Sequence, residues 1–596
     1  MKRIEKELAS RKADVERLDT LLRAVPADVC RVESSAAFLA AMEPVLAQLG
    51  AMAARSPLPP VRAPAATAAQ LDAFSRWFAA HGGVLHASVA PALLPGYGAA
   101  LCVARDAPGP LAADELVVRV PRALVLSEET ALRAEGVAAL FGGRAVAAQF
   151  PETALALQVL HEATRGSGES TSSTSTASFW APYLAALPER YATPLFWARD
   201  DFCALRGSPA LYESLMGVKA AATQYCHFFR ALAAHRDLAA RFVSPRLFTW
   251  PRFAWALSAV MTRKNRIPVL PATDRTIVQA RKEASGAVGE AAEKKKKKNQ
   301  KQEEQQEEEQ EQTMVCLIPM WDLHNHEPGR ITTFAVPPAG AVECRAQRAF
   351  APGEQVFIHY GDRPNMQLLS HNGFVLTDAP NPADIVLVAR PAPTDADAAL
   401  RAHKAALLAR LVPRAAGPYA FFVATHTGEP SPALLAAARV LALSAEDVAV
   451  LLALDSDGID EALSRLAREP LSEAHERAAR HRVAEACLRQ LLAYPGRFAD
   501  DCAELVAARA AHTHVHCATP VQRAARALCL LEKYALTRAA GLLRAFPGKD
   551  TLDFDFSIFD VLVVGDGGDG ATSSTPASSS GSKDAHQGHH HKSSKH

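Results

Sequence analysis

The pattern of apolar and polar residues predicts helices at the start of the chain, followed by a small β unit. Residues 1–24 place charged and apolar residues at helical spacing, which predicts one amphipathic helix. Leu71 to His81 shows the same spacing and is followed by a Gly-Gly pair, a sequence typical of a helix end. Two β-prone runs come next, Ala99–Ala104 and Glu115–Val120, with a Pro/Gly turn between them.

The rest of the chain continues with helices, strands and again helices. Residues 145–261 carry apolar residues mostly at helical spacing, and residues 398–545 do so again with many Ala and Leu. Three β-prone runs lie between them, at 331–336, 342–346 and 355–360. Because neither group of strands is long enough to stand alone, we expect the two groups to pair across the helical block. The predicted fold class is α+β.

Composition marks the segments that cannot join a packed core. Residues 56–66 are rich in Pro and Ala and predict a linker, and residues 166–178 predict a Ser/Thr/Gly-rich loop. Residues 279–313 contain a lysine run and a Glu/Gln run, and they hold too little apolar surface to stay compact. The predicted regions are an N-terminal helix and linker (1–67), the first part of a β core (68–144), a helical insertion (145–260), the second part of the core with the disordered insertion (261–380), a helical domain (381–545) and a mostly disordered tail (546–596).

The overall charge and the cysteines narrow the class of protein. The chain has 596 residues, with 65 Lys+Arg against 64 Asp+Glu and a formal net charge of +1. This balance disfavours bulk attraction to nucleic acid or membrane, and no apolar run reaches the roughly 18 residues of a membrane span. The N-terminus lacks the apolar core of a signal peptide, and no two of the 10 cysteines are spaced as C-x-x-C. We therefore expect a cytoplasmic protein with no nucleic-acid or membrane partner; the nucleus is the alternative if Lys294–Lys298 acts as an import signal.

One cluster has the composition of a metal site. It consists of His512, His514, His516 and Cys517, which alternate as they would on one face of a strand. The segment lies among predicted helices and has no matching second cluster, so we expect a turn with exposed histidines and no metal.

Three motifs carry candidate chemistry: MTRKNRIP at 261–268, LIPMWDLHNHEPG at 317–329 and FIHYGDRPNMQLLSHNGF at 357–374. Taken singly, their residues have ordinary structural explanations. Asn265 can cap a helix, and Arg263 can form a surface ion pair. Trp321 and Tyr360 can pack in a core, and Asn325-His326 can form a simple turn. Their occurrence together in this order favours a common site.

Together the motifs resemble the SET-domain protein methyltransferases of the Rubisco large-subunit methyltransferase-like branch, and within it the actin-histidine N-methyltransferases. A further block, FWAPYLAALPERYATPLFW at 179–197, supports the resemblance, which covers roughly residues 68–380 and, more loosely, the helical region to about 545. It implies a β-rich SET core with a pseudo-knot, split by a helical insertion and followed by an all-helical substrate-binding domain. It also implies S-adenosylmethionine as cofactor and a protein substrate, namely actin.

The resemblance assigns cofactor contacts to a turn before the first SET strand, to the end of the motif helix, to the threaded segment and to the segment after Tyr360: Pro95, Gly96, Tyr97, Arg263, Asp322, Asn325, His326, Asn372 and Phe374. An arginine suits the cofactor carboxylate because its guanidinium can donate two parallel hydrogen bonds. The chain departs from its relatives at several of these places. Pro95 replaces an acidic residue, Asn372 replaces a small hydroxyl residue, Lys264 replaces a neutral amide, and Thr67 stands where relatives carry an arginine.

The type of target side chain is predicted from acid–base chemistry and from two residues of the motifs, Asn265 and Trp321. A histidine ring, with a reference pKa of about 6.5, is mostly neutral at physiological pH, whereas a lysine, at about 10.4, must first lose a proton. The enzyme must still fix the tautomer and orientation of the ring; the Asn265 amide can hold one ring nitrogen, and Trp321 can form a flat wall. By resemblance, Tyr360 lies at the methyl-transfer channel and Arg363 near the bound peptide. We therefore predict methyl transfer to a histidine ring nitrogen, with Tyr360, Asn265 and Trp321 as catalytic residues.

Two alternative functions stay open at this point. The first is a protein-lysine N-methyltransferase that acts on the Rubisco large subunit or on another protein. The second is a non-catalytic SET-like module that binds a partner, and the departures at Pro95 and Thr67 keep it open.

Overall fold

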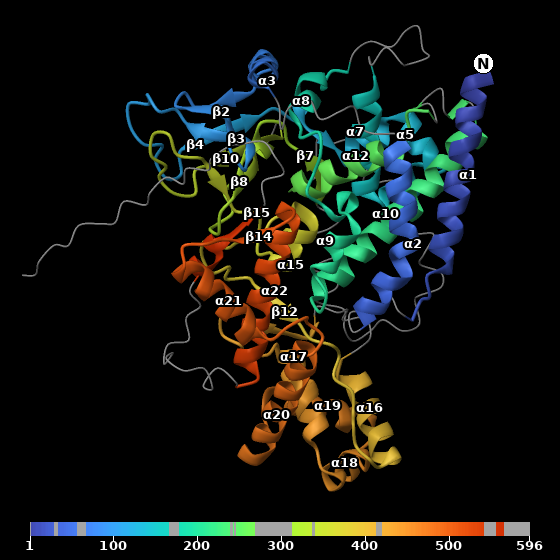
Figure 1. Cartoon of the computed structure of the whole chain (residues 1–596), viewed down its shortest axis with the longest axis vertical. Helices are drawn as coiled ribbons and strands as arrows, with labels where there is room; N and C mark the ends of the chain where they lie inside the picture. The colour runs from blue at the N-terminus through green and yellow to red at the C-terminus, as the bar shows by residue number, and fades with distance from the viewer. Residues whose placement is uncertain are drawn as a thin grey trace, which may run out of the picture.

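The computed structural model describes residues 2–28, 34–55, 67–165, 178–235, 237–238, 242–243, 246–268, 313–336, 340–412, 420–541 and 556–564. The predicted linker at 56–66, almost all of the loop at 166–178 and of the insertion at 279–313, and all of the predicted tail at 546–596 except 556–564 lie outside these residues. Figure 1 shows a β-rich part beside a block of helices, with a second group of helices at the opposite end of the molecule.

Strands from the two sides of the helical block pair with each other, which confirms the predicted pairing. In the four-stranded sheet, ordered β1-β4-β10-β9, β4 (Leu116–Val120) runs antiparallel to β10 (Ala341–Arg345). In the three-stranded sheet, β7 (Thr313–Leu317) lies between β5 (Leu126–Ser127) and β6 (Asn265–Pro268). Neither half of the core can therefore complete its sheets without the other.

The remaining strands form pairs or sheet edges: β1 (Val84–Leu85), β2 (Val89–Leu94), β3 (Gly98–Val103), β8 (Asn325–His326), β9 (Thr333–Val336), β11 (Phe357–Ile358), β12 (Ile385–Leu387), β13 (Phe422–Ala424), β14 (Val515–Cys517) and β15 (Leu562–Val564). The parallel pair of β8 with β11 places Asn325 opposite Phe357 and His326 opposite Ile358. This pairing brings two of the three sequence motifs together. The threading of the chain through a pseudo-knot stays a prediction.

The N-terminal half is mostly helical outside these sheets, and it comprises α1 (Lys2–Ala24), α2 (Ser35–Arg55), α3 (Ala68–Ala80), α4 (Glu128–Arg133), α5 (Glu135–Leu140), α6 (Arg144–Ala148), α7 (Pro151–Thr164), α8 (Ala181–Ala186), α9 (Arg199–Cys203), α10 (Pro209–Ala234) and α12 (Trp250–Arg263), with 3-10 turns η2 (Arg122–Leu124) and η3 (Pro194–Phe196). Thr67 caps α3, because its hydroxyl accepts from the Gln70 amide at 3.2 Å. A capping role thus explains the residue that replaces the relatives' arginine.

Helix α2 has the length and hydropathy of a membrane span, a feature that the sequence analysis did not expect. It is the one such helix among the described residues. Its Phe38, Met42 and Val45 are fully buried, and the helix packs against α1 and α10 (Figure 1). Burial of this face in the main core accounts for the apolar composition.

The C-terminal region is mostly but not wholly helical, so the expectation of an all-helical domain was wrong in part. Its helices are α16 (Ala398–Leu411), α17 (Pro432–Ala442), α18 (Ala445–Leu452), α19 (Ser456–Arg468), α20 (Glu473–Leu491), α21 (Phe498–Ala510) and α22 (Pro520–Ala539). The pairs β12–β13 and β14–β15 lie among them. The segment of η9 (Phe556–Val561) and β15 packs against α21 and α22, although it falls in the region predicted as a mostly disordered tail.

Strand β14 also corrects the expected histidine-bearing turn. His512 and His514 lie in an exposed turn, but Val515–Cys517 pairs in parallel with β15 and buries Cys517. Within the described part of the chain, no group of three or more His, Cys, Asp or Glu side chains has the arrangement of a metal site.

Gly207 lies where the helical insertion meets the C-terminal domain. The Gln490 amide donates to its carbonyl at 2.7 Å, and Ser208 next to it donates to the buried Glu532 carboxyl at 3.0 Å. Burial raises the pKa of Glu532 to about 8, so this carboxyl stays protonated at neutral pH. The joint between the two domains is therefore closely packed.

Replacing Gly207 with alanine should destabilise this joint by roughly 1–3 kcal/mol. Gly207 has a φ of +89°, and an added Cβ would lie 2.6 Å from the Tyr494 Cα, a backbone atom that cannot rotate away. The change can be measured as a drop in the thermal unfolding midpoint and as faster proteolysis between the domains. Gly217→Ala, in the open middle of α10 with no atom within 4 Å, is the matched control and should stabilise slightly. Equal midpoints for both variants would contradict the close packing of Gly207.

Candidate active site

A cavity of about 380 Å³ opens where the three motifs meet. Its walls come from the end of α12, from β6, from the 3-10 turn η4 (Trp321–Leu323), from β9 and from the segment after β11: Thr262, Arg263, Lys264, Asn265, Arg266, Ile267, Pro268, Trp321, Asp322, His324, Ile331, Thr333, Phe334, His359, Tyr360, Gly361, Arg363 and Asn372. Seven of the predicted site residues are in this lining. The volume falls within the usual range of small-molecule sites.

Arg263, at the end of α12, and Asp322, in η4, form a buried ion pair beside the cavity. Their charged atoms lie 3.8 Å apart, and Arg263 also donates to the Asp322 carbonyl. Tyr183, fully buried on α8, donates to the Asp322 carboxylate at 2.6 Å. Burial raises the pKa of Asp322, and the guanidinium and the hydroxyl oppose that rise. Arg263 therefore does not form the surface ion pair that is an arginine's commoner role.

Two polar atoms of this ion pair lack partners in the described part of the chain. They are the Arg263 Nε and the Asp322 Oδ1, both buried. Buried polar atoms are nearly always hydrogen-bonded, so these two atoms beside the cavity are exceptions. A guanidinium N–H and a carboxylate oxygen match the carboxylate and the ammonium of an amino acid.

Asn265 lies in a strand and not at a helix cap, so the capping alternative is wrong. Helix α12 ends at Arg263 with Lys264 as its C-cap, and Asn265 pairs with Cys316 across β6 and β7. Its Oδ1 accepts from the Arg266 amide at 2.7 Å, which leaves the side-chain NH₂ and a second oxygen lone pair for a ligand.

Trp321 serves both the core and the cavity wall. It is 8% exposed, and its indole Nε1 donates to the Thr333 hydroxyl at 2.9 Å. This hydrogen bond fixes the plane of the ring while one part of it lines the cavity. Asn265 and Trp321, which are far apart in sequence, therefore line the same cavity.

Tyr360 lies beside a group of uncharged histidines. Its hydroxyl donates to the His324 carbonyl at 2.7 Å, and its ring stacks on His326 with the centroids 5.0 Å apart. Burial raises the pKa of Tyr360 to about 12 and lowers the pKa values of His324 and His326 to about 4. At physiological pH, Tyr360 is thus a neutral donor, and both histidines are neutral.

Arg363 and Asn372 contact each other on the cavity wall. The guanidinium donates to the Asn372 Oδ1 at 3.1 Å, and Asn372 donates to the Thr262 carbonyl at 3.2 Å. Asn372 ends the π-helical turn η5 (Leu368–Asn372), which follows the short helix α15 (Asn365–Gln367). Burial lowers the pKa of Arg363, whose guanidinium is hydrogen-bonded to this neutral amide.

The other predicted residues lie next to the cavity or apart from it. The Phe374 ring is 6.2 Å from His326, and the Asn325 amide donates to Gln355. Pro95, Gly96 and Tyr97 form the exposed turn between β2 and β3, and they do not line the cavity. The structure thus leaves the predicted role of this turn unsupported.

Several residues of this site were not predicted from the sequence. Tyr183 and His324 stand inside the quoted motifs and were not singled out, and His359 precedes Tyr360. His324 is 1% exposed, and its Nδ1 lies 2.7 Å from the Trp321 carbonyl, so Nδ1 carries the proton. The sign of these three residues in the sequence was their position within the quoted motifs.

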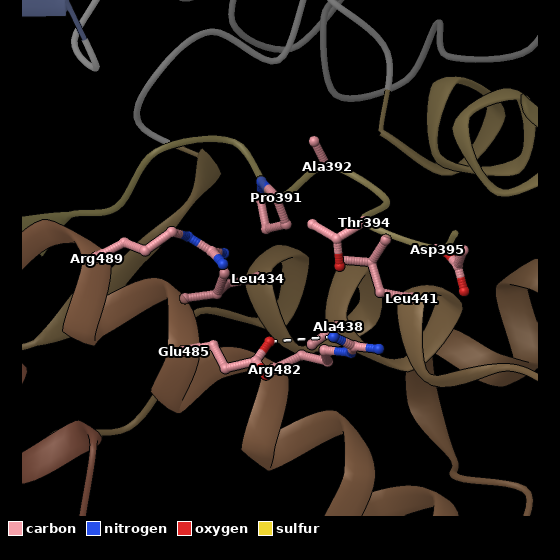
Figure 2. A pocket seen from close by; sticks show the side chains of 10 residues that line it. All are labelled: Pro391, Ala392, Thr394, Asp395, Leu434, Ala438, Leu441, Arg482, Glu485 and Arg489. Carbon is pink, nitrogen blue, oxygen red and sulfur yellow. Dashed lines mark hydrogen bonds and ion pairs between the residues drawn. The ribbon is translucent and has the colours of Figure 1, made fainter. Parts of the chain in front are cut away.

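A second pocket lies in the C-terminal domain, between α17, α20 and the loop at 391–395 (Figure 2). Arg482 donates to Glu485 at 3.1 Å across its floor. Its volume of about 10 Å³ holds roughly one water molecule, so it cannot take a cofactor. It contains none of the predicted site residues.

The arrangement of the β core and the helical domains matches solved Rubisco LSMT structures. The SET domain of LSMT bound to lysine and AdoHcy aligns with a TM-score of 0.55 at 18% sequence identity, over 80% of this chain and 92% of that chain. Rubisco LSMT bound to AdoMet aligns with a TM-score of 0.52 over the same shares. Residues 395–536 match the family model of the Rubisco LSMT substrate-binding domain. The chain therefore has the SET fold of LSMT, followed by a mostly helical region that matches the substrate-binding domain of that type.

In sequence, the chain is similar to actin-histidine N-methyltransferases. The protein of Drosophila melanogaster is 32% identical over 399 residues, which are 64% of this chain and 62% of that protein. The protein of Homo sapiens is 30% identical over 338 residues, which are 56% of this chain and 47% of that protein. The chain thus spans about half to three fifths of the length of these relatives. These matches confirm the resemblance indicated by the motifs.

Proposed function

We propose that this protein is an S-adenosylmethionine-dependent protein-histidine N-methyltransferase whose substrate is actin. The observation that carries the proposal is the cavity lined jointly by Asn265, Trp321 and Tyr360. Its amide, flat wall and phenol are the groups that a neutral ring needs for orientation. Actin as the substrate follows from the similarity to the actin-histidine N-methyltransferases.

The residues of the site fit S-adenosylmethionine. Arg263, which lines the cavity, would hold the carboxylate of its methionine part, and the buried Asp322 carboxylate behind it would fix the guanidinium in place. The aromatic rings of His326 and Phe374 would flank the adenine. When bound, this cofactor supplies the methyl group on a sulfonium.

The chain's own residues orient the target and exclude water. Asn265 holds one nitrogen of the target ring, so that the lone pair of the other nitrogen faces the methyl donor. Trp321 restricts the ring plane, because its own indole is fixed by Thr333. Tyr360 donates to the His324 carbonyl, and with its raised pKa it orients and does not act as a base. The main contribution of these residues to catalysis is alignment.

The pH dependence of kcat/KM tests the histidine assignment. A histidine target should give a rate that rises as its imidazolium loses a proton and reaches a plateau above about pH 7. His324 and His326, with pKa values of about 4, and Tyr360, at about 12, titrate outside this window and should leave the profile unchanged. The profile can be measured with purified actin as substrate. A rate that keeps rising toward pH 10 would indicate a lysine target instead.

The location in the cell belongs to the same proposal. Nine cysteines in the described part of the chain are free, and several of them are buried, which supports a reducing compartment. We assign the protein to the cytoplasm, and fractionation of cells that express the tagged chain is the direct test.

A further inference from the structure

The charges around the cavity do not balance. Its lining holds the cations Arg263, Lys264, Arg266 and Arg363 and a single carboxylate, Asp322. Two of these cations have acidic partners, because Arg263 pairs with Asp322 and Lys264 with Glu152. Arg266 and Arg363 remain without an acidic partner among the described residues.

Arg266 is the cation nearest to solvent in this set. It is exposed, and its guanidinium has no ion pair or hydrogen bond with the described part of the chain. It lies on β6 directly after Asn265, and β6 packs against β9, which carries the 52% exposed Phe334 of the same lining. Arg266 is therefore an exposed cation of the lining, close to the exposed Phe334.

Strand geometry sets what Arg266 can reach. Neighbouring residues of a strand point to opposite faces, yet Asn265 and Arg266 both line this cavity, so Asn265 can face the target ring while the long Arg266 side chain reaches the peptide beside it. Consecutive Cα atoms of a peptide lie about 3.8 Å apart, and an extended arginine spans roughly two such steps. A planar guanidinium prefers a carboxylate as its partner.

We propose that Arg266 is a specificity-determining residue that selects an acidic side chain within about three residues of the methylated histidine. This inference rests on the proposed function, and it deepens that function by naming the chemistry of the target segment. The arginine that the relatives carry near the bound peptide corresponds to Arg363, so the role proposed for Arg266 is a separate one.

The test is a set of histidine peptides that carry Glu, Gln or Lys at each position flanking the histidine. The wild-type protein should prefer Glu over Gln at one position by about three- to fivefold in kcat/KM, through KM and not kcat. Arg266→Gln should remove the preference, Arg266→Glu should shift it to Lys, and added salt should weaken it in the wild type. Arg105→Gln, at an exposed arginine that does not line the cavity, removes the same charge and should keep the preference.

Two results would overturn this inference but leave the proposed function intact. A preference for Glu that persists in Arg266→Gln would show that another residue of the protein selects the acidic residue beside the histidine. A weaker Kd for S-adenosylmethionine in Arg266→Gln, measured by calorimetry, would show that Arg266 serves the cofactor. If the wild-type protein binds the cofactor but methylates no histidine peptide, the proposed function fails, and this inference fails with it.

Discussion

Replacing Asn265 with phenylalanine should lower kcat/KM for the histidine substrate about a hundredfold, because misplacing a reacting group by about 1 Å costs roughly that much. The amide that holds one ring nitrogen is lost, and the bulkier ring fills part of the cavity beside Trp321. An aliphatic amine needs no such amide, so lysine methylation should rise relative to histidine methylation. Mass spectrometry of paired histidine and lysine peptides measures both activities in one reaction.

Asn265→Ala is the matched control for this substitution. It also removes the hydrogen bond to the Arg266 amide, but it adds no bulk to the cavity. It should cost about tenfold for histidine, the worth of one hydrogen bond, without a gain for lysine. If both variants lost cofactor binding and thermal stability alike, Asn265 would have a structural role only. Unchanged histidine activity in Asn265→Phe would show that its assigned role is wrong.

Replacing Arg263 with methionine should destabilise the β core by about 3–5 kcal/mol, because it leaves the Asp322 carboxylate buried without its counter-charge. The pKa of Asp322 is already raised by burial, and it should rise further in the variant. A group whose pKa is higher in the folded state favours folding while it is protonated, and that contribution is lost as the pH rises through the folded pKa. The penalty should therefore be larger at neutral than at acidic pH, as measured by urea unfolding.

The double variant Arg263→Met with Asp322→Asn is the control for this prediction. Removing both charges should recover most of the lost stability, whereas cofactor binding should stay lost. Equal stability of the single and double variants would show that the ion pair is not what holds this part of the core. Normal cofactor affinity in either variant would contradict the proposed roles of Arg263 and Asp322.

Much of the architecture could be predicted from the sequence, because short strands must find partners. The runs at 115–120 and 342–346 are too short to stand alone, and they pair as expected as parts of β4 and β10. Strand β14 could not be predicted, because its three residues pair with β15 more than forty positions later. The apolar composition of α2 predicts burial or a membrane span equally well, and only its packing against α1 and α10 decides between them.

The candidate site was predictable as a set of motifs, but its geometry was not. The motifs indicated Asn265, Trp321 and Tyr360 together, and the structure places all three in one cavity. The buried pairing of Arg263 with Asp322 depends on Tyr183 from a distant helix, which local sequence does not show. The turn at Pro95, assigned by resemblance alone, lies outside the cavity lining.

The reaction that we propose for this cavity is methylation of a histidine of actin. The most direct measurement is methyl transfer from S-adenosylmethionine to two peptides in parallel, one with the actin target histidine and one with lysine in its place, read by mass spectrometry. We expect methylation of the histidine peptide alone. Methylation of the lysine peptide alone would keep the fold and contradict the assigned chemistry.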